Sequence, residues 1–140
     1  MKKYEFIGHT ADVRLVIEGD TKEELFTAAL LGMNELMKKG ECADPGDGQP
    51  TITEEIEVSA PDFTALLVDF MSTVLTMSHQ YKAVFCDVVF SELSDDTLKA
   101  KIMGREVEQF DEDIKAATYH EADVRENEAG NLQTTIVFDI

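Results

Sequence analysis

Residues 13–25 read Val-Arg-Leu-Val-Ile-Glu-Gly-Asp-Thr-Lys-Glu-Glu-Leu, and this stretch decides the fold. The apolar residues at positions 13, 15 and 17 fall on one face and the polar Arg14 and Glu18 on the other, as in a half-buried strand. A glycine–aspartate turn follows. Thr21 and Glu24 then have the spacing of a capping box, which is typical of a helix start. The stretch therefore predicts a strand, a turn and a helix in close succession.

Outward from this stretch, the chain alternates between strand and helix patterns. Apolar residues continue at helical spacing to about residue 37, and Gly40 marks the end of that helix. Residues 3–7 and 52–58 are expected to be strands. The segment Ser59-Ala60-Pro61-Asp62 is typical of the start of a second helix, whose apolar stripe fades near residue 78.

The C-terminal half has the pattern of antiparallel strands. Apolar positions alternate with polar ones over residues 84–90 and 98–102, separated by a turn at Ser94-Asp95-Asp96. Residues 114–120 and 132–140 predict two more strands. With two helices, about six strands and no βα repeat, we expect a single α+β domain over residues 1–140. Its two layers would be a mixed, mainly antiparallel sheet and two covering helices.

The charge of the chain restricts its partners. The sequence holds 29 acidic and 12 basic residues in 140, a formal net charge of −17. Binding to nucleic acid or to an anionic membrane depends on Lys and Arg, so we expect neither from this chain alone. A basic protein partner or cations are the expected counterparts, although such an excess of acid can also serve only solubility.

Two cysteines, Cys42 and Cys86, lack the spacing of a zinc or redox motif. We expect them to be free thiols. Free thiols and the absence of a signal-peptide pattern predict a cytoplasmic protein, and no apolar run approaches the roughly 20 residues of a membrane span.

Carboxylates near the two ends of the sequence suggest a metal site. Asp139 and the terminal carboxylate of Ile140 are one residue apart, and Asp12 lies in the tight segment 8–12. Oxygen-only sets of this kind suit hard cations such as Mg²⁺ or Ca²⁺. The alternative is that Asp12 caps a turn, that Asp139 is solvated, and that the two never meet.

Other polar residues give weaker signals. Lys115 lies in a predicted strand beside acids, where it could neutralise a carboxylate or reach a phosphate, or simply be exposed. His9 could hydrogen-bond Asp12, although a single histidine is more often structural. The sequence contains no Gly-rich phosphate loop, HExxH, GxSxG or Cys–His signature, so a self-sufficient nucleotide-processing enzyme is not expected.

Three stretches together resemble the archease family. They are Gly8-His9-Thr10-Ala11-Asp12-Val13, Ile114-Lys115-Ala116-Ala117-Thr118-Tyr119-His120 and Ile136-Val137-Phe138-Asp139-Ile140. Their order and spacing match, and the likeness extends to residues 21–26 and 66–70, so it covers nearly the whole chain.

The resemblance implies a non-catalytic, chaperone-like helper in tRNA splicing. Archeases activate the tRNA-splicing RNA ligase: they promote guanylylation of the ligase histidine, support multiple turnover and widen the nucleotides used, GTP and ATP among them. The family's metal site maps onto Asp12, Asp139 and Ile140 and would hold Ca²⁺, Mg²⁺ or Mn²⁺. Its functional lysine maps onto Lys115, and His9 would lie near the partner or nucleotide.

Two other functions remain open. One is an acidic binding module that masks a basic partner surface without any metal; its action would weaken steeply with salt. The other is a metal-dependent hydrolase that acts alone, which the absence of a nucleophile–base pair disfavours.

Overall fold

The computed structural model describes residues 2–8, 12–42 and 50–140 of the chain. In these ranges the elements are β1 (Lys3–Gly8), β2 (Asp12–Gly19), α1 (Lys22–Met37), β3 (Ile52–Ser59), α2 (Phe63–Tyr81), β4 (Ala83–Leu93), β5 (Thr97–Glu106), β6 (Ala116–Thr118), β7 (Arg125–Glu126) and β8 (Leu132–Asp139). None of the described helices is both long and apolar enough to cross a lipid bilayer.

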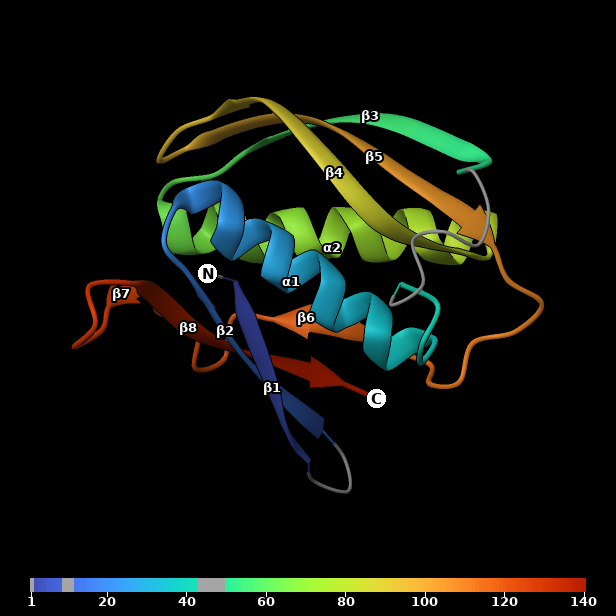
Figure 1. Ribbon diagram of the computed structural model, residues 1–140, viewed down its shortest axis with the longest axis horizontal. Helices are drawn as coiled ribbons and strands as arrows, with labels where there is room; N and C mark the ends of the chain where they lie inside the picture. Colours follow the sequence, from blue (N-terminus) through green and yellow to red (C-terminus); the bar gives the residue numbers. More distant parts are fainter. Residues whose placement is uncertain (1, 9–11, 43–49) are drawn as a thin grey trace.

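The strands form two antiparallel sheets with both helices between them (Figure 1). One sheet has the order β1-β2-β8-β6, with β7 also paired to β8, and the other has the order β3-β5-β4. The predicted α+β class is confirmed. The strands are divided between two sheets rather than joined in one, and each helix contacts both sheets.

In the larger sheet, β2 lies between β1 and β8. Its alternation is as predicted: Val13, Leu15 and Ile17 are buried, whereas Arg14 and Glu18 are only partly covered. The apolar positions face the helices, so the polar positions of β2 lie on the outer face of the sheet.

Helix α1 begins as the capping box predicts. The Glu24 amide donates to Thr21 Oγ1 at 3.1 Å, and Glu24 Oε1 accepts from the Asp20 amide at 3.0 Å. Farther along, α1 lies close to β2 because Gly32 has no side chain: a Cβ at this position would lie 2.8 Å from the δ carbons of Leu15. The cap fixes where α1 starts, and Gly32 sets how near it lies to the strand.

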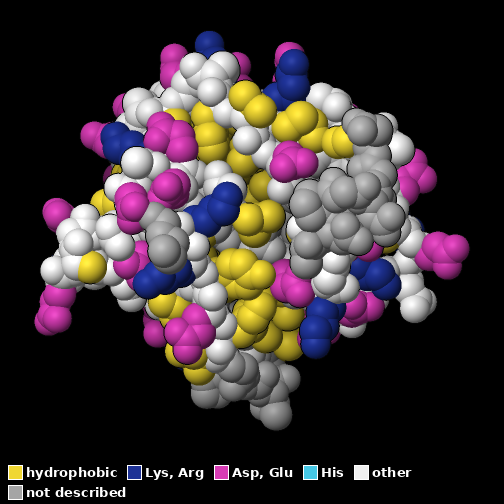
Figure 2. Space-filling model, in the orientation of Figure 1, with side chains coloured by type: hydrophobic (Ala, Val, Ile, Leu, Met, Phe, Trp, Pro, Cys, Tyr) yellow, Lys and Arg dark blue, Asp and Glu magenta, His cyan; other side chains and the backbone are white. Residues whose placement is uncertain are grey.

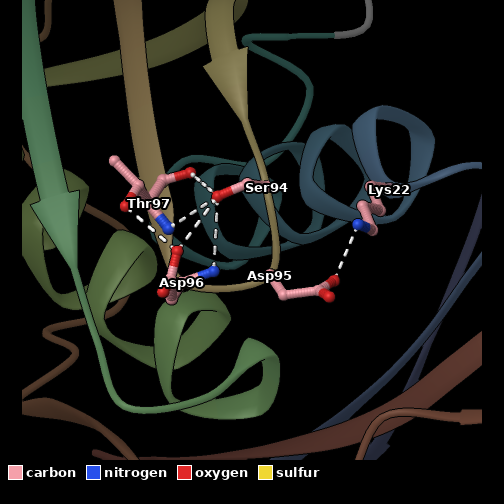
Figure 3. Close-up of polar contacts among 5 residues, drawn as sticks. All are labelled: Lys22, Ser94, Asp95, Asp96 and Thr97. Carbon is pink, nitrogen blue, oxygen red and sulfur yellow. Dashed lines mark hydrogen bonds and ion pairs between the residues drawn. The ribbon is translucent and has the colours of Figure 1, made fainter.

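The β4–β5 hairpin is connected to α1 (Figure 3). Its turn is closed by the Ser94 amide, which donates to the Thr97 carbonyl at 2.9 Å, while Ser94 Oγ accepts from the Thr97 amide at 3.1 Å. Asp95, at the tip, accepts from Lys22 Nζ at 2.7 Å. The predicted turn is confirmed, and its tip lies against the first turn of α1.

One buried polar side chain joins the layers within the apolar core. Asn34 of α1 is fully buried; its Nδ2 donates to the Leu30 carbonyl at 2.8 Å, and its Oδ1 accepts from the Phe85 amide of β4 at 3.0 Å. A buried amide that satisfies both its donor and its acceptor fixes the position of α1 against β4 more specifically than apolar contact does.

The expectation of free thiols is wrong, because Cys42 and Cys86 form a disulfide with 5.3 Å between their Cα atoms. Sequence spacing gave no sign of it, since 44 positions separate the pair. The fold brings them together by packing the C-terminal end of α1 beside β4. Next to the disulfide, Arg105 Nη2 donates to the Glu41 carbonyl at 2.7 Å, and Arg105 Nε lies 3.3 Å from Glu41 Oε1. The cytoplasmic prediction therefore loses the support that it drew from free thiols.

Candidate functional site

Asp12 and Asp139 are direct cross-strand partners. Asp12 is the first residue of β2 and Asp139 the last of β8, and the antiparallel register places them opposite each other. Side chains of directly opposed residues lie on the same face of a sheet with Cβ atoms about 4.5–5.5 Å apart. The two acids therefore lie together, and the alternative in which they never meet is excluded.

Two like charges in this position destabilise the pairing unless something neutralises them. The nearest described cation is Arg14, on the same face of β2, whose Nη1 lies 3.6 Å from Asp12 Oδ1. Arg14 is only partly available, because its Nε donates to Glu121 Oε2 at 2.7 Å. The described side chains thus leave an excess of negative charge at this end of the sheet.

Glu121 occupies a strained position. Its φ of 66° lies in the left-handed region, which costs a residue with a Cβ about 1–2 kcal/mol. This conformation places the carboxylate over the outer face of the sheet beside Arg14, where it ties the segment after β6 to β2.

One oxygen of Asp12 lacks a hydrogen bond. Oδ1 is buried and receives none from the described residues, although the side chain as a whole is 31% exposed. A buried oxygen without a donor is unfavourable unless a cation or water satisfies it. The donor set of Asp12 and Asp139, both hard oxygen ligands, fits a hard divalent cation.

The pair alone does not complete a metal site. Over residues 2–8, 12–42 and 50–140, no three His, Cys, Asp or Glu side chains lie close enough together to hold an ion. Ile140 follows Asp139 directly and packs partly buried against the core. The described residues thus supply two carboxylates here and no third His, Cys, Asp or Glu side chain; His9 lies outside the described residues.

Lys115 lies beside this pair, although it is not in the strand as predicted. Strand β6 is shorter than expected and starts at Ala116, which pairs with Asp139. The Lys115 amide nevertheless donates to the Asp139 carbonyl at 2.8 Å, and its side chain is exposed. Asp139 is thus flanked by Asp12 on one side and by the start of β6 on the other.

A second polar contact follows β6. The exposed Tyr119 donates its hydroxyl hydrogen bond to Asp69 of α2, and this bond, with a smaller effect of burial, raises the tyrosine pKa. The residues before and after β6 therefore bond to β8 and to α2, respectively.

The sequence interpretation missed Arg14 and Glu121 as members of the site. Arg14 had a usable signal, because residues two apart on a strand share a face and Asp12 is two positions away. Glu121 had none, since it reaches Arg14 from 107 positions away through a turn.

Comparisons with known proteins agree on one family. The model of the Archease protein family matches residues 4–140. The archease of Methanosarcina mazei is 31% identical, with 99% of this chain and 97% of the relative covered, and that of Thermococcus kodakarensis is 32% identical, with both chains fully covered.

Solved structures have the same fold. The solution structure of protein 1598 from Methanobacterium thermoautotrophicum matches with a TM-score of 0.75 at 25% identity, covering 98% of each chain. A crystal structure from Thermotoga maritima, described as an archease and possible chaperone, matches with a TM-score of 0.64 at 22% identity, covering 96% of this chain and 94% of that one; this likeness concerns the fold alone. From the match to the family model and the full-length relatives, the chain belongs to the Archease protein family.

Proposed function

We propose that this protein is a non-catalytic activator of the tRNA-splicing RNA ligase. It would promote guanylylation of the ligase histidine, with GTP or ATP bound by the ligase, and so support repeated turnover. The observation that carries the proposal is the opposition of Asp12 and Asp139 at one end of the larger sheet. Membership of the archease family supports it, because the resemblance to archeases implies an RNA ligase as the partner.

The proposed metal site consists of the Asp12 and Asp139 side chains and the main-chain carboxylate of Ile140. Three oxygen donors leave coordination positions for water or for the partner's ligands, as hard cations such as Ca²⁺, Mg²⁺ or Mn²⁺ allow. When bound, the cation would offset most of the negative charge of these carboxylates, and its remaining coordination positions could accept phosphate oxygens. Asp12 Oδ1, which lacks a hydrogen bond from the described residues, would gain a partner.

Lys115 and His9 are proposed as contacts to the partner or its nucleotide. The Lys115 side chain is exposed, and the Lys115 amide bonds to the Asp139 carbonyl, so the residue belongs to the same end of the sheet as the proposed metal site. A lysine ammonium group is a common partner of phosphate. His9 lies outside the described residues, so its part is proposed from the sequence.

The test is a multiple-turnover ligation assay with the cognate ligase at several Mn²⁺ concentrations. We expect Asp12→Asn and Asp139→Asn to abolish stimulation without unfolding the protein, and Lys115→Ala to reduce it. Glu57→Gln, an exposed acid on β3 of the other sheet, is the matched control and should stimulate normally. Normal stimulation by both aspartate variants would refute the metal mechanism.

A second candidate function is an acidic module that masks a basic partner surface without a metal. The net charge of −17 favours it. In that case Asp12→Asn and Glu57→Gln would stimulate equally well, and chelation of metal would have no effect. Stimulation would fall steeply between about 50 and 300 mM salt, because exposed charges farther apart than the Debye length are largely screened.

A further inference from the structure

Strand β1 is an open edge of the larger sheet. It ends the strand order and pairs only with β2 among the described strands (Figure 1). Its register with β2 runs without a bulge from Lys3 to Gly8, and the strand contains no proline. Every second residue of such an edge directs its N–H and C=O groups away from the sheet. Natural edges are blunted by charged side chains, bulges, prolines or coverage; β1 carries the charged Lys3 and Glu5 but has no bulge and no proline.

Apolar side chains lie along this edge. Tyr4 and Phe6 pair with Ile17 and Leu15, so they are on the side of the sheet that faces α1, yet they remain 41% and 38% exposed. Their rings contact each other edge to face, with centroids 5.8 Å apart. Ile7, on the other side of the sheet, is 46% exposed. Figure 2 shows hydrophobic side chains gathered on the face where α1 and β1 lie.

The charges around this edge select the kind of partner. A second copy would also carry −17, and two such chains repel each other, so self-association is disfavoured. Next to the aromatic pair, Glu5 is exposed on β1 and Glu35 of α1 acts on Tyr4, whose pKa is raised by burial and then by that carboxylate. Lys3 is balanced by Glu18, its cross-strand partner. A partner with positive charge fits.

We propose that β1 is a docking edge for an extended segment of a basic protein partner. The segment would add a sixth strand to the five-stranded sheet, with apolar side chains on Tyr4 and Phe6 on the face toward α1 and Lys or Arg side chains toward Glu5 on the other face. Gly8, at the end of β1, pairs with Val13 next to Asp12, so the added strand would run along the edge toward the opposed carboxylates. The proposal does not require a metal there.

The first test uses a defined peptide. Acetyl-Lys-Val-Lys-Ile-Lys-Val-Lys-amide is titrated into the ¹⁵N-labelled full chain at 150 mM salt, and backbone amide shifts are followed. The control peptide has the same sequence and charge but is N-methylated at alternate residues, so it cannot pair with an edge. We expect shifts centred on residues 3–7 and affinity at least about tenfold weaker for the methylated peptide, because it loses several backbone hydrogen bonds. Equal affinity of the two peptides would show bulk charge attraction and overturn the proposal.

The second test changes the surface. Tyr4→Ser/Phe6→Ser should weaken the parent peptide about tenfold or more through lost apolar contact. Val89→Ser, which removes a 60% exposed residue from β4 of the other sheet, should leave binding unchanged. If the double variant fails to fold, Glu5→Lys serves in its place: Glu5 is exposed, and the reversed charge should also weaken binding of the basic peptide. Equal losses with Val89→Ser would overturn the proposal. The proposal would also be overturned if sedimentation showed that the chain alone forms a dimer and that the β1 variants abolish it, because β1 would then bind a second copy.

Discussion

Arg14 bonds more closely to Glu121 than to Asp12. Its Nε lies 2.7 Å from the Glu121 carboxylate, whereas its Nη1 lies 3.6 Å from Asp12 Oδ1. The guanidinium is therefore shared, with its short contact to the acid that is distant in sequence. The Asp12 carboxylate is therefore only partly neutralised by Arg14, and Arg14 would compete with any cation that binds Asp12.

Because Arg14 is shared in this way, we predict that Arg14→Gln lowers the stability of the metal-free protein and raises its affinity for Mn²⁺. Without the guanidinium the acids repel one another, so the metal-free protein should lose about 0.5–1 kcal/mol of unfolding free energy, as for a partly exposed ion pair. Mn²⁺ affinity, measured by calorimetry, should rise several-fold, because the competing positive charge is gone. Weaker Mn²⁺ binding by this variant would contradict the proposed competition.

Metal binding should stabilise the fold through Asp12 and Asp139. At a Mn²⁺ concentration about 100 times its Kd, a ligand that binds only the folded state adds about 2.7 kcal/mol to the unfolding free energy. Thermal melts should show this gain for the unaltered chain and lose it for Asp139→Asn. Glu57→Gln serves as the matched control. A gain that survives Asp139→Asn would locate the metal elsewhere.

The disulfide should make a large contribution to stability. It links positions 44 apart, and closing a loop of this length in the unfolded chain gives about 2–4 kcal/mol. Urea unfolding in the presence and absence of a reductant measures the difference. Cys42→Ser/Cys86→Ser is the control, since its stability should not respond to the reductant.

Asn34 should be hard to replace. Asn34→Leu keeps a similar volume but leaves the Phe85 amide of β4 without its acceptor in the core, which costs about 1–3 kcal/mol. The expected result is a lower urea midpoint with an unchanged slope. The Phe85 amide should exchange with solvent faster than its neighbours in β4; unchanged exchange there would contradict the bridging role.

Asp111 should give a pH-dependent contribution. Hydrogen bonds from the Lys39 amide and then from the Lys38 ammonium hold the Asp111 pKa below its usual 3.8. Because the folded-state pKa is the lower one, its contribution is present above about pH 3.8 and is lost as pH falls through the folded-state value. In a pH series of melts, the loss of stability of Asp111→Asn relative to the unaltered chain should shrink below about pH 4. Glu57→Gln, which changes an exposed acid on β3, is the control.

The parts of the fold that depend on local pattern could be predicted from the sequence. The capping box at Thr21 and the alternation of β2 are set by neighbouring residues, and both predictions are confirmed. The division into two sheets could not be predicted, since it depends on which strands meet across the helices. For the same reason the pairing of Cys42 with Cys86, which depends on contact between distant segments, does not follow from the sequence. The meeting of Asp12 and Asp139 was foreseen as one alternative, whereas Glu121 reaches the site through a left-handed backbone that no short-range pattern indicates.

Helix α1 lies close to β2, the strand that begins with Asp12, at Gly32, which has no side chain. Because Leu15 fills the space beside Gly32, even a methyl group there would overlap the Leu15 δ carbons, so that side chain or the helix would have to shift against the strand that begins with Asp12. A single carbon added on the inner side of this helix would therefore disturb the packing behind the same strand whose first residue is one of the two opposed acids.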